Sequence, residues 1–151
     1  MHSHTYMRRM NDLGPLACHC VVTRQMARHV SRIYERHLGR AEVTATQLAI
    51  LSFLARGHSA MTMAEMAEVM QMDRTTLLRA IKPLRQKGWM RVRPEKNEPR
   101  RNELTLTSAG KAKRERALPL WQAAQAEYEA EIGPEHARRL RSEFLNMTGA
   151  L

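Results

Sequence analysis

The sequence of 151 residues is poor in aromatic side chains and in cysteine. Aromatic residues make up only 5%, so the hydrophobic core has to be built from aliphatic side chains and methionine. Two cysteines cannot form the disulfide framework of a small secreted domain. No apolar run approaches the roughly 18 residues that span a membrane, and residues 1–11 are too polar for a signal peptide. We therefore expect a cytoplasmic protein that has no membrane partner.

Positive charge is in clear excess. Lysine and arginine number 25 and aspartate and glutamate 15, which gives a formal net charge of +10. In a chain of this size, such an excess is typical of a protein that binds a polyanion, above all nucleic acid. Hydrophobic residues reach 43%, enough for a folded core. The length fits one compact domain with an added dimerisation layer.

Helical spacing of apolar residues and capping signals divide the chain into helices. Residues 13–38 are predicted to form one long helix, which Gly39 ends. In a capping box, a threonine and the residue three positions later satisfy each other's backbone N–H groups. Two such boxes predict the next two helix starts: Thr44 with Gln47, ahead of a helix that ends at Gly57, and Thr62 with Glu65.

A fourth helix is predicted to begin after Asp73, a strong N-cap residue, and to end at Gly88. Pro83 removes a backbone donor inside this helix, so we expect a kink or a loss of regularity there. The residues predicted to face the core are Leu77, Leu78, Ile81 and Leu84.

Two segments of strand-like alternation follow, at residues 89–93 and 103–107. The charged, proline-bounded loop 94–101 joins them, so the segment predicts a β-hairpin with a long basic tip. Thr107 is predicted to cap a helix that runs to about residue 132, and Gly133 with Pro134 separates it from a last helix.

Short helices followed by a basic hairpin predict a winged helix-turn-helix, mainly α with a small β-hairpin and a helical dimerisation region. The N-terminal residues of a helix in the major groove meet base edges or phosphates, and arginine on a hairpin tip suits the minor groove. The alternative is that these basic residues form an ordinary solvent-exposed face that does not contact DNA. Glu98 is expected to pair with Arg100 or Arg101 and to shape the loop. The predicted DNA-binding residues are Arg74, Thr75, Thr76, Arg79 and Lys82 on the helix, and Arg93, Lys96, Arg100 and Arg101 on the wing.

Three segments carry a more specific resemblance: Asp73-Arg-Thr-Thr-Leu, Ile81-Lys-Pro-Leu-Arg-Gln-Lys-Gly-Trp, and Leu104-Thr-Leu-Thr-Ser-Ala-Gly. Together they resemble the MarR family of bacterial transcriptional regulators, over about residues 13–148. The resemblance implies a homodimer with intertwined terminal helices, bound to double-stranded DNA at a palindromic operator and usually acting as a repressor. It also implies release by a small aromatic or phenolic effector held between the dimerisation helices and the DNA-binding lobe. The family's wing carries Asp-x-Arg, which implies that Arg100 contacts DNA, although Glu98 replaces the aspartate here.

Cys18, His19 and Cys20 have three interpretations. They are small apolar residues in the wall of a dimer or pocket, part of an effector site with Arg24, or a site of redox or metal chemistry in which Cys18 or Cys20 senses oxidants. On one helix, residues two positions apart project about 200° from each other, which argues against a shared metal ion or an intrachain disulfide. The segment also resembles MarR-type repressors of aromatic and nicotinate catabolism, which implies that His19 and Arg24 meet the carboxylate of an aromatic acid.

The expected organisation is an N-terminal arm and first dimerisation or pocket helix at 1–43, a DNA-binding domain at 44–107, and C-terminal dimerisation helices at 108–151. Motifs for a nucleophile elbow, a phosphate loop or a metal-binding His/Glu pair are missing, so we expect no enzyme, no catalytic residue, no metal and no cofactor. A ligand-responsive repressor is the predicted function. The alternatives are a thiol-based redox-sensing repressor of the same fold and a non-specific architectural DNA-binding protein.

Overall fold

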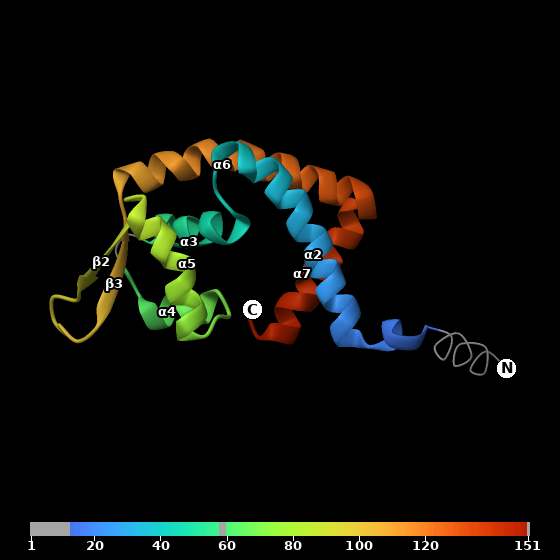
Figure 1. The fold of residues 1–151 in the computed structure, drawn as a ribbon, viewed down its shortest axis with the longest axis horizontal. Helices are drawn as coiled ribbons and strands as arrows, with labels where there is room; N and C mark the ends of the chain where they lie inside the picture. The colour runs from blue at the N-terminus through green and yellow to red at the C-terminus, as the bar shows by residue number, and fades with distance from the viewer. Residues whose placement is uncertain (1–12, 58–59, 151) are drawn as a thin grey trace.

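The computed structural model describes residues 13–57 and 60–150, and the predicted N-terminal arm lies outside them (Figure 1). The fold is helical with one small antiparallel sheet, as predicted. The helices are η1 (Gly14–Ala17), α2 (His19–Leu38), η2 (Gly39–Ala41), α3 (Ala45–Arg56), α4 (Met63–Val69), α5 (Arg74–Gln86), α6 (Ser108–Ile132) and α7 (Pro134–Thr148). The strands are β1 (Met61–Thr62), β2 (Met90–Pro94) and β3 (Asn102–Leu106). No helix in the described ranges is long and apolar enough to cross a membrane.

Two hydrophobic clusters hold the chain together, and α3 belongs to both. The larger cluster joins α3, α4, α5 and the sheet, and its fully buried members include Leu51, Leu77 and Leu104. The smaller cluster joins the end of α2 to α3 and α6 through Leu38 and Leu48. Both predicted capping boxes are present, so the starts of α3 and α4 are confirmed.

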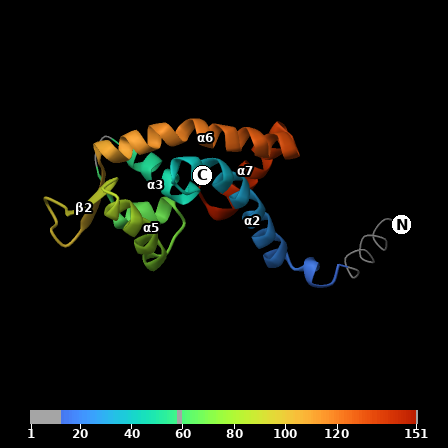
Figure 2. The same cartoon turned by 45° about the horizontal axis from the view of Figure 1, so that its top comes forward.

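α6 runs from the β2–β3 hairpin at one end of the molecule to α7 at the other (Figures 1 and 2). α2 packs along it. His29 Nε2 donates to Glu131 Oε1 at 2.7 Å, and His37 Nε2 donates to Glu127 Oε2 at 2.6 Å. Glu127 also pairs with Arg36. The hydrogen bond from His37, and then the nearby Arg36, hold the pKa of Glu127 below its usual value.

The prediction of one helix over residues 13–38 is wrong at its start. Gly14 adopts a left-handed φ of +54° and Pro15 has no N–H, so only a short 3-10 helix forms there. Cys18 is then extended, with φ −75° and ψ 114°, and serves as the N-cap of α2. Within this chain only Ile33 and Leu38 of α2 are buried, so the N-terminal half of its apolar face is uncovered.

α5 begins after Asp73 as predicted, but one residue that was expected to face the core does not. Leu78 is 46% exposed, because Leu77, Ile81 and Leu84 already occupy the inner face and position 78 lies a further 100° round the helix. Pro83 lies inside the helix, which continues beyond it to Gln86, and the kink or loss of regularity expected there stays a prediction.

The sheet has the order β1-β3-β2, with Met61 opposite Leu104 and Val92 opposite the same residue on the other side. The predicted hairpin is confirmed, although β2 begins and ends one residue later than predicted and β3 one residue earlier. The two-residue β1 was not predicted, because such a short strand has no alternation to reveal it.

Candidate nucleic-acid interface

The first turn of α5 is fixed by its cap. Thr76 donates its backbone N–H to Asp73 Oδ1 at 2.8 Å and its hydroxyl to Oδ2 at 2.9 Å. These two bonds lower the pKa of Asp73, so its carboxylate is charged at neutral pH. The cap leaves the hydroxyl of Thr76 engaged within the helix. All the predicted DNA-binding residues of this helix are exposed: Arg74, Thr75, Thr76, Arg79 and Lys82.

The wing tip is closed by its own hydrogen bonds. Glu95 donates its N–H to the carbonyl of Arg101 at 2.8 Å, and Arg101 donates its N–H to the carbonyl of Glu98 at 2.8 Å. Of the two partners that the sequence left open for Glu98, the structure pairs it with Arg101, at 2.9 Å. The predicted DNA-binding residues of the wing are all exposed: Arg93, Lys96, Arg100 and Arg101.

The wing and α5 lie at the same end of the molecule, so their basic side chains belong to one region of the surface (Figures 1 and 2). In the helix and wing together, the residues named above carry seven positive charges at neutral pH. Such a surface attracts a phosphate backbone. A helix flanked by a basic hairpin also has the shape to fill a major groove and reach the adjacent groove.

The predicted effector residues lie elsewhere. Cys18, His19, Cys20 and Arg24 are all exposed around the start of α2. The prediction that both cysteines lie on one helix is wrong, because Cys18 is extended, so the 200° projection between helical residues does not apply to Cys18 and Cys20. Their role in effector binding stays a prediction.

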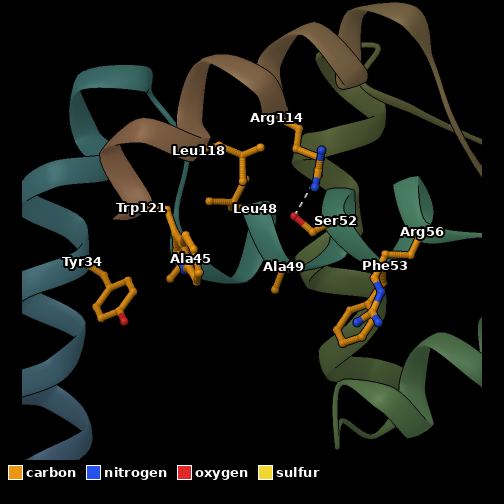
Figure 3. Close-up of a pocket in the computed structure, with 10 residues that line it drawn as sticks. All are labelled: Tyr34, Ala45, Leu48, Ala49, Ser52, Phe53, Arg56, Arg114, Leu118 and Trp121. Carbon is orange, nitrogen blue, oxygen red and sulfur yellow. Dashed lines mark hydrogen bonds between the residues drawn. The ribbon is translucent and has the colours of Figure 1, made fainter. Parts of the chain in front are cut away.

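A cavity of about 410 Å³ lies between α2, α3 and α6 (Figure 3). Its walls are mostly apolar, with Phe53 and Trp121 among them. Arg114 enters from α6 and donates its Nε to Ser52 Oγ on α3 at 3.2 Å. Tyr34 faces the cavity from α2. Burial, and then the nearby Tyr128 and Glu129, raise the pKa of its phenol, which stays protonated at neutral pH.

Comparisons with known proteins match this arrangement. A family model described as the MarR family covers residues 43–101. The M. tuberculosis transcriptional regulator MosR, solved in complex with DNA, is 33% identical to this chain, with a TM-score of 0.76 over 88% of this chain and 95% of its own. The chain belongs to the MarR family. This MarR-family protein is a DNA-binding transcriptional regulator with the winged helix-turn-helix fold, and its family and neighbours are regulators and not enzymes.

Two more distant structures share the MarR-family fold. BpsR of Bordetella bronchiseptica, whose DNA binding is regulated by 6-hydroxynicotinic acid, is 18% identical, with a TM-score of 0.76 over 87% of this chain and 93% of its own. CouR of Rhodococcus jostii RHA1, bound to p-coumaroyl-CoA, is 14% identical, with a TM-score of 0.72 over 84% and 88%. Comparison with curated proteins gave no match.

The motif that suggested the MarR family has a clear structural role here. Thr107 caps α6 because its hydroxyl oxygen accepts the backbone N–H of Gly110. It also donates its hydroxyl to the carbonyl of Gly88 at 2.6 Å and its backbone N–H to the carbonyl of Trp89 at 3.2 Å. A Cβ at Gly110 would lie 2.0 Å from the same Trp89 oxygen, so the glycine lets α6 pack directly on the base of the wing.

The residues that line the cavity were not predicted from the sequence. On α6, Arg114, Leu118 and Trp121 recur at helical spacing, and on α3 a polar Ser52 interrupts an otherwise apolar face. Those were the available signals. They do not show that the two faces oppose each other across a space, which depends on how α3 and α6 pack.

Proposed function

We propose that the protein is a homodimeric repressor that binds a palindromic operator and leaves it when a small aromatic acid or phenolic effector binds. The observation that carries this proposal is the combined basic surface of the α5 N-terminus and the wing, together with the cavity between α2, α3 and α6. The MosR complex with DNA supports the nucleic-acid partner, and the ligands named for BpsR and CouR support the effector class.

Operator recognition is tested by selecting binding sequences from random DNA with the wild-type chain. We expect a palindrome, because a two-fold symmetric dimer presents two copies of α5. Arg79→Ala then weakens binding by about 1–3 kcal/mol if the guanidinium contacts a guanine. Arg85, exposed near the other end of the same helix, provides the matched control, and Arg85→Ala retains most of the affinity.

Two results would contradict this assignment of DNA contacts. Unchanged operator affinity in both Arg74→Ala and Arg79→Ala would show that the N-terminal part of α5 does not read bases. Equal affinity for operator and random DNA across a salt titration would instead identify a non-specific architectural protein.

The homodimer is supported by apolar side chains that one chain leaves exposed. They lie on η1 and the residue before it, at the start of α2 and at the end of α7: Leu13, Leu16, Val22, Phe144 and Met147, the last of them 74% exposed. Large apolar side chains left exposed in this number on the terminal helices are typical of an interface. Sedimentation at micromolar concentration is expected to give a dimer, and Phe144→Asp is expected to dissociate it. A wild-type monomer would refute the proposal.

The cavity supports an effector that is flat, largely apolar and negatively charged at one end. Phe53 and Trp121 offer apolar walls, and guanidinium groups bind carboxylates with paired hydrogen bonds. Only the Nε of Arg114 is engaged, by Ser52, and among the described residues neither Nη has a hydrogen-bond partner. The neutral phenol of Tyr34 is a further donor at the opposite side.

A thermal-shift screen tests this chemistry. Because a ligand that binds only the folded state raises the unfolding temperature, we expect aromatic acids to stabilise the protein and their neutral amides to fail. Arg114→Met abolishes the shift, whereas Arg116→Met, at an exposed position of the same helix, retains it. A shift that survives Arg114→Met but is lost in His19→Ala or Arg24→Ala would move the effector to the start of α2.

A thiol-based sensor is the second candidate function, and the geometry of Cys18 favours it. Both thiols are exposed, and the extended N-cap removes the helical obstacle to pairing. Two thiols and a hydroperoxide give a disulfide, an alcohol and water. Under peroxide, we expect both thiols to disappear together and operator binding to fall. A Cys18→Ser/Cys20→Ser variant that is still inactivated would exclude this sensor.

A further inference from the structure

Lys113 is the one charged side chain that is buried among residues 13–57 and 60–150, with 8% of its surface exposed. It lies near the start of α6. Its Nζ donates to the carbonyl oxygen of Ala41 in η2 at 2.9 Å. The same Nζ lies 4.8 Å from the centre of the Trp89 ring, within the range of a cation–π interaction.

These two contacts join two segments that belong to different hydrophobic clusters. Ala41 packs against the smaller cluster, just before the chain enters α3. Trp89 is a buried member of the larger cluster, at the junction of α5 and β2. Lys113 itself follows the return of the chain from β3 into α6. One ammonium group therefore links the base of the wing and the end of α5 to the helical arm, which consists of α2, η2, α6 and α7.

Stability alone does not account for a lysine at this position. Removing an ammonium from water is costly, and an apolar side chain of similar volume often stabilises a protein as well as a buried charge does. Methionine has nearly the same length and is tolerant of irregular packing. What methionine cannot provide is a directed bond to Ala41 and an attraction to the ring face, both of which fix orientation.

We propose that Lys113 is a positioning residue that sets which half-site spacing the dimer accepts. The inference rests on the proposed function, because spacing has meaning only for a dimer on a palindrome. In each protomer, α5 reaches the groove as part of the larger cluster, while the partner subunit is held through the helical arm. The angle between cluster and arm therefore sets the separation of the two reading helices, and Lys113 holds that angle.

The test compares the selected operator with one that carries a single inserted base pair at its centre, which moves the half-sites apart and rotates one relative to the other. For the wild type we expect a loss of at least about tenfold, the size of a mismatched base pair. In Lys113→Met the loss falls to within about threefold, while the slope of log K against log salt stays as in the wild type, since no phosphate contact is removed. The unfolding temperature and the dimer are retained.

Lys87 provides the matched control. Its Nζ lies 4.6 Å from the centre of the same Trp89 ring, but it is exposed and makes no bond to η2. Lys87→Met therefore keeps the wild-type discrimination. If Lys113→Met does not fold, Lys113→Gln is used instead, because it is polar and one bond too short to reach Ala41.

The possible outcomes distinguish a failure of this inference from a failure of the proposed function. Wild-type discrimination in a folded Lys113 variant would overturn the inference and leave the repressor proposal intact. Equal relaxation in the Lys87 and Lys113 variants would also overturn it, because the cation–π contact and not the bridge would then be responsible. A wild-type chain that selects no palindrome would refute the proposed function and this inference together.

Discussion

Replacing Gly110 with alanine is the sharpest test of how the wing is attached to α6. An added Cβ would lie 2.0 Å from the carbonyl oxygen of Trp89 and 2.8 Å from Leu106 Cδ1. The leucine can move, but the oxygen cannot easily do so, since it belongs to the backbone and accepts the N–H of Thr107 at 3.2 Å. The substitution therefore forces α6 away from the wing.

The size of the effect follows from two opposing contributions. Overpacking a well-filled site costs about 3 kcal/mol at the upper end of its usual range. Alanine in place of glycine inside a helix returns about 1 kcal/mol. The net loss in the free energy of unfolding is about 2 kcal/mol, which lowers the unfolding temperature by about 4–8 °C for a chain of this length.

Urea unfolding followed by circular dichroism measures this loss, at one fixed protein concentration because a dimer's stability depends on it. Gly39→Ala is the control. Gly39 has an ordinary helical φ of −56°, and nothing lies within 4 Å of an added Cβ. We expect this variant to gain about 0.4–1 kcal/mol. If Gly110→Ala unfolds at the same urea concentration as the wild type or a higher one, with an unchanged slope, the packing argument is refuted.

Three further predictions concern α5 and the wing. Asp73→Ala lowers the unfolding temperature at neutral pH, and this deficit disappears in acid. The pKa of the Asp73 carboxyl is lowered in the folded state, so its contribution to stability is complete above the unfolded-state pKa and is lost as the pH falls through the folded-state pKa. A deficit in thermal unfolding that is constant with pH would contradict this. Leu77→Ala costs about 2–5 kcal/mol in chemical unfolding, whereas Leu78→Ala stays within about 0.5 kcal/mol because its side chain is exposed, and similar losses would disprove the assigned inner face. In salt titrations of operator binding, Arg100→Ala flattens the slope of log K against log salt by about 0.9, the value for one lost phosphate contact. Arg101→Ala flattens this slope less, because Arg101 already pairs with Glu98. An unchanged slope in both variants would show that the wing does not contact DNA.

The local elements could be predicted well because local chemistry determines them. The starts of α3, α4, α5 and α6 each follow from a cap residue whose partner lies three positions later, within one turn. The hairpin follows from alternation and prolines. These signals need no knowledge of the rest of the chain.

What failed depended on tertiary context or on competing local preferences. Helical spacing continued through Cys18, but the backbone of Gly14 and the missing N–H of Pro15 decided the conformation before it. Leu78 fits an apolar pattern, yet the face it belongs to is set by what α5 packs against. The cavity was missed for a similar reason: Arg114 and Ser52 are 62 positions apart, and nothing local indicates that they meet.

The order of two residues on α6 has a mechanical consequence. Arg114 faces the cavity, and Lys113, immediately before it, contacts Trp89 and Ala41. Consecutive residues of a helix project about 100° apart, so a small rotation of α6 about its own axis moves both side chains at once. A molecule bound against Arg114 that rotated α6 would therefore also move Lys113, and through its contact with Trp89 the rotation would reach the base of the wing.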